Sequence, residues 1–379
     1  MDRDGTPPMQ SPHTPSPHLQ SPHLQSPHTP SPPMLSPHLQ SPLMLRLGSG
    51  LGSPFVRMTS DEARSVVART YGLRVVGMSR IATERDDTFR VAVAAADYIL
   101  KIAHPEDDPR EIALQTAALA HATIRDPGLP VPRIIDPVDG RTSDVRTTDG
   151  RVVRMFSYLP GRLLSDSTAN PHQVRQCGRM LARLGNALAD FEHPASSRWL
   201  AWDLQHLDEL GELLPVIEGD DRRAAVADLL EKIAIETLPA LRTTRRQVVH
   251  NDFHGGNVLV DAASDDFITG ILDFGDVVHS FPVAELAVAM SYAGSYSSER
   301  RDPWAPALAL LDGYRSMTEL TETELDILPN LVLGRLAQRM LLGSWLASAR
   351  PENAGYTGRN IEVTRLQFVA MLGCPPKIR

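Results

Sequence analysis

The chain has 379 residues, of which 42% are hydrophobic and 22% charged, a composition typical of a folded globular protein with one large or two smaller domains. Its formal net charge of -8 argues against a protein that binds nucleic acid by neutralising phosphates. The two cysteines, Cys177 and Cys374, exclude a disulfide framework and a paired zinc motif, and they favour free thiols in a reducing, cytoplasmic location.

Membrane insertion is not indicated either. The most apolar stretch, LVLGRLAQRMLLGSWLASA, is interrupted by Arg335, Gln338 and Arg339, so it does not predict a membrane-spanning helix. The N-terminus lacks the charged start and continuous apolar core of a signal peptide. We therefore expect neither a membrane nor a nucleic acid as a partner.

Residues 11–45 form seven pentads that each begin with Ser-Pro. A proline at every fifth position removes a backbone donor and prevents both helix and sheet, which predicts disorder with polyproline-II character. The histidines that recur in the repeat could also bind metal, but nothing in the pattern preorganises them. Arg46 to Pro54 is rich in glycine and serine and is interpreted as a linker, so residues 1–54 are expected to be disordered.

Ordered structure is expected to begin near Thr59, with a helix in SDEARSVVARTYG between a polar cap and a glycine stop. Strand patterns follow at Arg74–Ser79, Thr88–Ala94 and Asp97–Ala103, then a helix at Pro109–Ala122 and strands in VPRIIDP and RVVRMFSYLPG. Helical patterns dominate afterwards, at Pro171–Phe191, Ala224–Leu241, Val283–Ala293, Trp304–Ser316 and Glu322–Ala349. The order predicts an α+β fold with a small β-rich lobe, residues 59–158, and a mainly helical lobe, residues 159–375. A cleft between lobes is a usual place for a small ligand.

The stretch VVHNDFHGGNVLVD carries His250, Asp252 and Asn257 between two apolar runs, and DFGD follows at Asp273 to Asp276. If the flanking strands pair, the loops bring Asp252, Asn257 and Asp273 together. Phosphoryl transfer needs such a set: one carboxylate orients the acceptor hydroxyl and takes its proton, while an amide oxygen and a second carboxylate hold Mg²⁺. Asp252 and Asn257 could instead be ordinary turn residues, and His250 is interpreted as a buried brace.

Lys101 stands alone in the apolar strand pattern DYILKIA, and Glu111 follows ten residues later at the start of the next helix. The two residues could form the Lys–Glu pair that positions nucleotide phosphates in kinases. Glu111 could alternatively belong to a capping box that begins at Asp108, with Pro109 at the first helical position.

In combination, VVHNDFHGGNVLV, GILDFGD, YILKIA and YLPGRLL resemble the aminoglycoside phosphotransferase-type kinase superfamily, which is related to the protein kinases. Within it, HPASSRWLAWDL, ILDFGDVVHSFPVAELAVAMSYA and ARPENAGY are most similar to the hydroxylysine kinase branch. The resemblance covers about Ser60 to Leu372 and implies a two-lobed, protein-kinase-like fold.

The resemblance also implies a role for each matching residue. Asp252 would be the catalytic base, Asn257 and Asp273 the metal ligands, and Lys101 the phosphate contact held by Glu111. The backbone of Phe156, Ser157, Tyr158 and Leu159 would form the hinge that binds the purine. For the acceptor, Asp276 and Glu285 are candidates to meet an amine, and Arg162 and His279 to meet a carboxylate; Asp276 could instead be a helix cap.

One departure from the protein-kinase pattern is the hairpin RIATERDDTFRVAV, which has no glycine where a glycine-rich loop would cover the phosphates. Asn251 stands where many protein kinases have arginine, and no activation loop with phosphosites is evident. We therefore expect an enzyme that uses Mg²⁺ to transfer phosphate from ATP or GTP to a small amino alcohol or hydroxy amino acid, hydroxylysine first. Homoserine, choline and aminoglycosides are alternative acceptors, and a non-catalytic nucleotide-binding scaffold is the alternative of another class.

Overall fold

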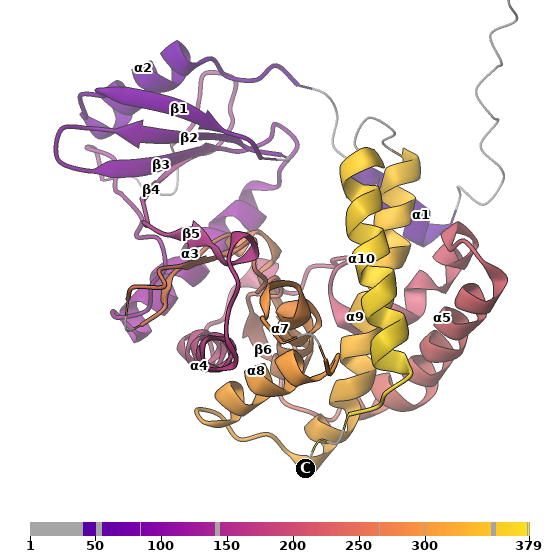
Figure 1. The fold of residues 1–379 in the computed structure, drawn as a ribbon. Coiled ribbons are helices and arrows are strands. Elements are labelled where there is room, and N and C mark those ends of the chain that lie inside the picture. Colours follow the sequence, from indigo (N-terminus) through magenta and orange to yellow (C-terminus); the bar gives the residue numbers. More distant parts are fainter. Residues whose placement is uncertain are drawn as a thin grey trace, which may run out of the picture.

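The computed structural model describes residues 41–50, 55–83, 85–140, 145–264, 266–299, 301–349, 354–376 and 378. Most of the Ser-Pro repeat and part of the expected linker, residues 1–40 and 51–54, lie outside the described residues, and with them the histidines considered as metal ligands. Two lobes are evident, a small one built on a sheet and a larger helical one (Figure 1). The expected α+β, kinase-like fold class is confirmed.

The small lobe is a four-stranded antiparallel sheet in the order β1-β2-β3-β4. Its strands are β1 Gly77–Ile81, β2 Asp87–Ala92, β3 Asp97–Ile102 and β4 Val153–Ser157. Helix α2, Ser60–Tyr71, packs on it; the helix begins at a capping box between Thr59 and Glu62 and ends at Gly72, whose φ of 63° is a left-handed stop that suits glycine. Alternate residues of β2 and β3, such as Phe89 and Leu100, are fully buried and form a separate core under α2.

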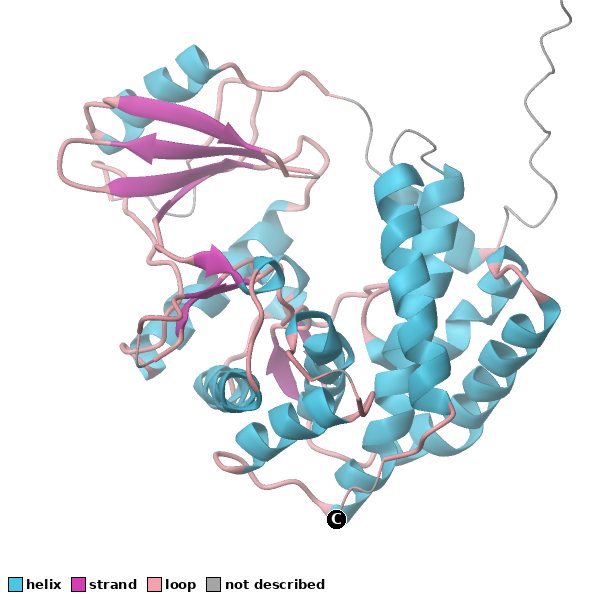
Figure 2. Cartoon of the chain, in the orientation of Figure 1, coloured by secondary structure: helices cyan, strands magenta, loops and turns pink. Residues whose placement is uncertain are grey.

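The larger lobe is mainly helical, as the cyan ribbons of Figure 2 show. Its principal helices are α4 Pro171–Ala187, α5 Asp220–Lys232, α7 Pro282–Tyr296, α8 Ala305–Arg315, α9 Glu322–Ala349 and α10 Ala354–Leu372. Shorter helical segments are η2 Leu164–Asp166, η3 Pro194–Ser196, η4 Leu204–Val216, the π-turn η5 Ile233–Thr237 and α6 Leu238–Leu241. Helix α7 lies in the centre of this lobe and is buried on nearly every side, in keeping with its apolar sequence.

Helix α3, Pro109–Arg125, follows the small sheet in sequence but packs into the larger core. Asp108 caps it through the Arg110 backbone N–H and Pro109 occupies its first turn. Its buried side chains, including Leu114 and Ala118, belong to the apolar cluster of the helical lobe. Helix α3 therefore packs with the helical lobe, although β4, which follows it in the chain, belongs to the small sheet, and the expected boundary near residue 158 stays a prediction.

Two small antiparallel sheets hold the loops between the lobes. One has the order β5-β7-β8, with β5 Arg162–Leu163, β7 Val258–Val260 and β8 Ile268–Ile271, and the other pairs β6 Gln247–Val249 with β9 Val278–Ser280. Because Val249 pairs with Val278, the segment after β6 and the segment before β9 meet at the same end of this pair. The segments are the HNDFHGGN loop and the DFGD loop, so the register itself brings the two motifs together.

The structure corrects several expected elements. Helix α1, Pro42–Gly50, occupies the end of the repeat that was expected to be disordered and the first part of the expected linker, and its Leu43 and Leu47 are buried against the helical lobe. Pro42 is compatible with this helix because it takes the first position, where no backbone donor is needed. The segment VPRIIDP contributes only an isolated bridge from Ile134 to Phe156, and the helices η4 and α10 were not expected.

Candidate active site

Asp252 lies at the centre of a polar cluster in the loop between β6 and β7. The Asn257 side-chain amide donates to its Oδ2 at 2.7 Å, His254 Nε2 lies 3.3 Å from the same oxygen, and Arg335 Nη2 lies 3.5 Å from Oδ1. Its side chain is 23% exposed. Burial raises the pKa of Asp252, but the hydrogen bond and charge of His254, with the charges of Arg335 and His250, outweigh burial and lower this pKa to about 2. The carboxylate is therefore ionised at neutral pH.

Buried groups behind the loop hold it in place. His250 Nε2 donates to the Leu272 carbonyl at 2.9 Å and its Nδ1 accepts from the Asp252 backbone N–H at 3.3 Å, so one neutral imidazole ties the two motif loops together. Burial lowers the pKa of His250, in keeping with this neutral bracing role. Glu285 Oε1 accepts the backbone N–H groups of His250 at 2.7 Å and Asn251 at 3.1 Å. Asn251 has a φ of 67°, a left-handed conformation that asparagine tolerates better than most residues.

Asp273 faces the small lobe from the second loop. It has a φ of 58°, accepts the Gly275 backbone N–H at 3.1 Å, and its side chain is 53% exposed. Lys101 Nζ lies 3.9 Å from Asp273 Oδ1 and 3.8 Å from Asp86 Oδ2. The predicted phosphate contact and the predicted metal ligand thus lie next to each other, across the boundary between the lobes.

The predicted Lys101–Glu111 pair is not formed. Glu111 accepts from Arg198 Nη1 at 2.8 Å, and the same guanidinium donates from Nε to the Val277 carbonyl at 3.1 Å and from Nη2 to the Gly275 carbonyl. Arg198 therefore clamps helix α3 to the DFGD loop. No local pattern indicates this contact, because Arg198 is 87 residues away from Glu111.

A second cation, Arg154, lies beside Lys101 and was not expected. The two residues are direct partners across β3 and β4, so both side chains are on the same face of the sheet. Arg154 is 7% exposed, donates to Gln115 at 2.9 Å and lies 4.0 Å from Asp86. Burial raises the pKa of Asp86, and the charges of Lys101 and Arg154 oppose this effect. Two cations of the sheet thus lie around one half-buried carboxylate.

The oxygen donors expected to hold Mg²⁺ fit that ion. Both Asn257 amide hydrogens are directed to Asp252, at its Oδ2 and its carbonyl, which leaves Asn257 Oδ1 for another partner. The Leu272 backbone N–H donates to the Asn257 carbonyl at 2.7 Å, which places Asn257 beside the loop that carries Asp273. No group of three or more His, Cys, Asp or Glu suited to a metal occurs among the described residues. Two protein oxygens suit Mg²⁺, which usually takes its remaining ligands from phosphate and water.

The predicted hinge, Phe156 to Leu159, covers the end of the edge strand β4 and the turn that leaves it. Ser157 exchanges bonds with Arg133: its N–H donates to the Arg133 carbonyl at 2.8 Å, and its hydroxyl accepts the Arg133 N–H at 2.8 Å. The Tyr158 N–H donates to the Asp97 carbonyl at 3.2 Å. The hinge backbone is thus fixed at the boundary between the lobes.

The two acidic residues expected near a substrate amine have different surroundings. Asp276 lies near Asp252 and Asp273; burial and the charges of these two carboxylates raise the pKa of Asp276 to about 7, and Arg198 opposes the rise. Glu285 is 3% exposed and holds the backbone of the catalytic loop, so the structure corrects its expected role as a substrate contact.

The two basic residues expected near a substrate carboxylate are not brought together. Arg162 is exposed and donates to the Asp166 carbonyl at 2.8 Å. His279 pairs with Val248 in the middle of the β6–β9 sheet; burial and the charge of Arg246 lower the pKa of this histidine. Among the residues that the structure describes, no hydrogen bond or ion pair joins either side chain to Asp252.

An arginine from α9, Arg335, takes the place beside Asp252 instead. Arg335 and Arg339 both lie over the ring of Tyr292, and the ring of His254 also stacks on Tyr292, at 4.8 Å. A signal for these residues existed: polar side chains interrupt an otherwise apolar helix at intervals of three and four, which places them on one helix face. The same interruption argues against a membrane span, and among the described residues no helix has the length and apolarity to cross a bilayer.

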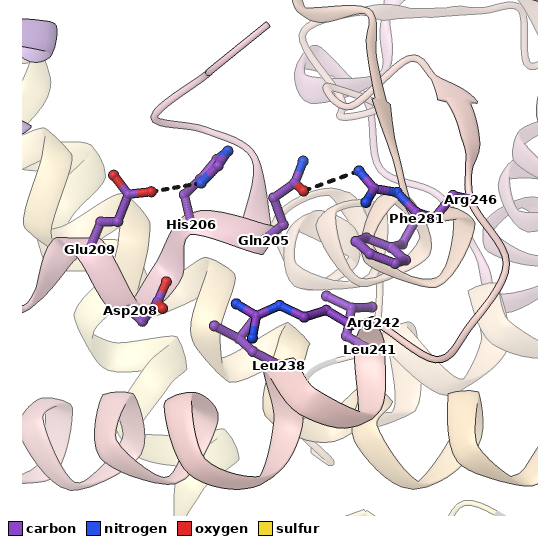
Figure 3. Close-up of a pocket in the computed structure, with 9 residues that line it drawn as sticks. All are labelled: Gln205, His206, Asp208, Glu209, Leu238, Leu241, Arg242, Arg246 and Phe281. Carbon is purple, nitrogen blue, oxygen red and sulfur yellow. Dashed lines mark hydrogen bonds and ion pairs between the residues drawn. The ribbon is translucent and has the colours of Figure 1, made fainter. Parts of the chain in front are cut away.

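A pocket of about 210 Å³ lies elsewhere, between η4, α6 and the start of α7 (Figure 3). Gln205 and Arg242 line it together with Arg246 and Phe281. Arg246 precedes β6 and Phe281 follows β9, so the pocket lies at the end of this strand pair opposite to Asp252. It is therefore separate from the catalytic loops.

Comparison with known proteins agrees with this geometry. Residues 78–322 match the model of the phosphotransferase enzyme family. A curated hydroxylysine kinase from Danio rerio is 28% identical over 313 residues, which cover 79% of this chain and 87% of that protein. A microcompartment-associated aminopropanol kinase has a similar fold, with a TM-score of 0.63 at 21% identity over 83% of this chain and 98% of that one. The amicoumacin kinase hAmiN, solved with AMP-PNP and Ca²⁺, has a TM-score of 0.62 at 17% identity over 82% of this chain and 93% of that one.

Proposed function

We propose that this chain, which belongs to the phosphotransferase enzyme family, is a kinase that transfers the γ-phosphoryl group of ATP or GTP to a hydroxyl of an amino alcohol or hydroxy amino acid, with hydroxylysine as the first candidate. The observation that carries the proposal is the cluster of Asp252, Asn257, Asp273 and Lys101 where the two lobes meet. The proposal starts from two premises: the chain is a small-molecule phosphotransferase, and its phosphate donor is a nucleotide.

Asp252 orients the acceptor and receives its proton. The hydroxyl oxygen forms a bond to the γ-phosphorus while the bond from phosphorus to the leaving oxygen of the nucleotide breaks, and the hydroxyl proton passes to Asp252. With a pKa of about 2, Asp252 is always ionised but only weakly basic. It therefore acts mainly by positioning the hydroxyl in line, and it takes the proton late, when the new bond has acidified the oxygen.

Around it, the chain holds charges where the phosphates would lie. Lys101 and Arg154 project from one face of the small sheet toward the DFGD loop and would attract the nucleotide phosphates. Asn257 and Asp273 would hold Mg²⁺, which supplies electrostatic stabilisation of the transferring group when bound. Asp86 lies within 4.0 Å of both cations, so phosphates would compete with it for them.

The order of acceptor candidates rests on the relatives. The sequence similarity to the hydroxylysine kinase from Danio rerio covers most of both chains, which supports hydroxylysine as the first acceptor to test. Homoserine, choline and aminoglycosides remain alternative acceptors for the same scaffold. A non-catalytic nucleotide-binding protein is disfavoured because Asp252 keeps its ionised form and its contacts.

A kinase assay with ATP and with GTP, over a panel of hydroxylated amines and amino acids, tests the proposal. We expect hydroxylysine to be phosphorylated and Asp252→Asn to reduce kcat by about a hundredfold to ten-thousandfold, the usual contribution of a general base. Nucleotide binding should change little, because Asp252 lies on the acceptor side of the phosphates. Asp228→Asn, an exposed position on α5, is the matched control. Full turnover in Asp252→Asn would remove Asp252 from this role.

A further inference from the structure

Helix α9 carries two arginines into the interior of the helical lobe. Arg335 and Arg339 are four residues apart and therefore occupy the same helix face, one turn from each other. Arg335 is 1% exposed and Arg339 is half-buried. Guanidinium groups removed from water are costly unless they are paired and fully hydrogen-bonded, so a buried arginine beside a half-buried one requires an explanation.

Arg335 is largely accounted for by the protein. Its Nη1 donates to the Trp202 carbonyl at 2.7 Å and to Gln338 Oε1 at 2.9 Å, and its Nη2 faces Asp252 Oδ1 at 3.5 Å. Its guanidinium also lies 5.0 Å from the centre of the Trp202 ring. Arg335 is thus a fixed group that positions Asp252, although its Nε is buried without a hydrogen-bond partner among the described residues.

Arg339 is different because the described protein leaves it without a counter-ion. Its Nη1 is buried and has no hydrogen-bond partner in the described part of the chain, and its guanidinium carbon lies 4.0 Å from the centre of the Tyr292 ring. Burial lowers the pKa of Arg339, and the charge of Arg335 lowers it further. The aromatic face holds the guanidinium plane in place but does not satisfy its in-plane donors.

Arg339 is connected to the catalytic base Asp252 through side chains other than those expected to face the nucleotide phosphates. Asp252 contacts His254, His254 stacks on Tyr292, and Tyr292 lies under Arg339. The phosphate-facing cations project instead from the small sheet, on the side of Asp273. A group bound at Arg339 would therefore belong to the acceptor rather than to the nucleotide.

We propose that Arg339, held flat on Tyr292 and supported by Arg335, binds a carboxylate of the acceptor, so that the enzyme selects hydroxy amino acids over amino alcohols and aminoglycosides. This inference rests on the proposed kinase function and names the substrate class for the same site. A planar carboxylate matches the forked donors of a guanidinium and supplies the negative charge that Arg339 lacks among the described residues. The carboxylate is bound by α9, not by Arg162 and His279.

A binding comparison of matched acceptors tests the selection. Hydroxylysine and homoserine are each compared with their decarboxylated analogues by isothermal titration calorimetry, with the full chain and a non-hydrolysable ATP analogue. We expect at least one of the two acids to bind more tightly than its analogue by about tenfold to a hundredfold, the usual effect of one charge-assisted contact. Equal or better binding of both analogues, or binding of neither acid at millimolar concentration, overturns the inference.

Variants of Arg339 assign the selection to this residue. Arg339→Gln should reduce the preference for the acid over its analogue to about onefold, while Arg339→Lys, which keeps the charge but loses the fork, should keep part of it. Arg175→Gln, an exposed arginine on α4 that pairs with Asp312, is the matched control and should keep the full preference. A full preference in Arg339→Gln overturns the role of Arg339.

The assays separate this inference from the proposed function. If an acid binds with an Arg339-dependent preference but neither acid is phosphorylated, the kinase proposal fails for these acceptors and the carboxylate site stands. If amino alcohols are phosphorylated as efficiently as the acids, the kinase proposal stands and the carboxylate site is refuted.

Discussion

Glu285 distinguishes a residue that supports the catalytic loop from one that binds substrate. It lies in the first turn of α7, and its Oε1 accepts the backbone N–H groups of His250 and Asn251. Burial raises the pKa of Glu285 from an ordinary 4.5 to about 7, and the two backbone hydrogen bonds only partly oppose the rise. We therefore expect Glu285→Gln, which keeps an oxygen acceptor, to differ sharply from Glu285→Ala, which removes it.

The magnitude follows from the pKa of Glu285. Between about 4.5 and 7 the unfolded chain loses the proton while the folded protein keeps it, so stability present below pH 4.5 is lost as the pH rises toward 7. At about 1.4 kcal/mol per pH unit, the loss is about 3 kcal/mol by pH 7. Glutamine does not ionise, so Glu285→Gln should be as stable as the wild type or more stable at about pH 8. Alanine leaves two buried N–H groups unpaired, at about 1–3 kcal/mol each.

Urea unfolding of the wild type and both variants, at about pH 5 and about pH 8, measures these differences. The pH dependence should be weaker in Glu285→Gln, and its acceptor KM should stay within about threefold of wild type, because the side chain is buried under the loop. Destabilisation of Glu285→Gln at pH 8 as large as that of alanine would refute the reasoning and show that burial does not raise the pKa of Glu285. A KM raised more than about tenfold at unchanged stability would instead restore Glu285 as a substrate contact.

Two further predictions concern the DFGD loop. Arg198→Gln removes the contact between Glu111 and the loop, so the loop that carries Asp273 is no longer held against α3. We expect kcat to fall by roughly tenfold or more, with little change in acceptor KM. In the same steady-state assays, Arg198→Lys should recover only part of kcat. Asp276 has a pKa raised to about 7, so if its carboxylate meets a substrate amine, acceptor KM should increase as the pH falls below 7, and Asp276→Asn should abolish this dependence. A wild-type KM that does not vary between about pH 6 and pH 8 would contradict that role for Asp276.

The sequence predicted the parts of the site that depend on local pattern. The spacing from Asp252 to Asn257 and the return at Asp273 lie between short apolar strands, and pairing of such strands is sufficient to bring the loops together. The family resemblance and the kinase-like fold class are also confirmed. Both could be predicted because each motif is local in sequence, and the motifs of the small lobe precede those of the helical lobe along the chain.

The contacts that the sequence did not reveal join segments far apart in the chain. Arg198 lies 87 residues from Glu111 and Arg335 lies 83 residues from Asp252, so no periodicity or spacing relates the partners. The expected pair between Lys101 and Glu111 failed because a guanidinium that also binds two carbonyls of the DFGD loop competes for the same carboxylate. Helix α1 was not predicted because the prolines of the repeat and the glycines that follow are typical of disordered segments, whereas two buried leucines decide its packing.

The distribution of charge around Asp252 gives the site a polarity that fits one type of acceptor. On the side of the DFGD loop, burial and the negative charges of Asp252 and Asp273 raise the pKa of Asp276, so this side favours a cation. On the side of α9, burial lowers the pKa of Arg339 and the charge of Arg335 adds to this effect, and Arg339 has no described counter-ion, so this side favours an anion. A zwitterionic amino acid that bears a hydroxyl satisfies both sides at once. An amino alcohol satisfies only the acidic side and leaves the cost of the buried arginine in place.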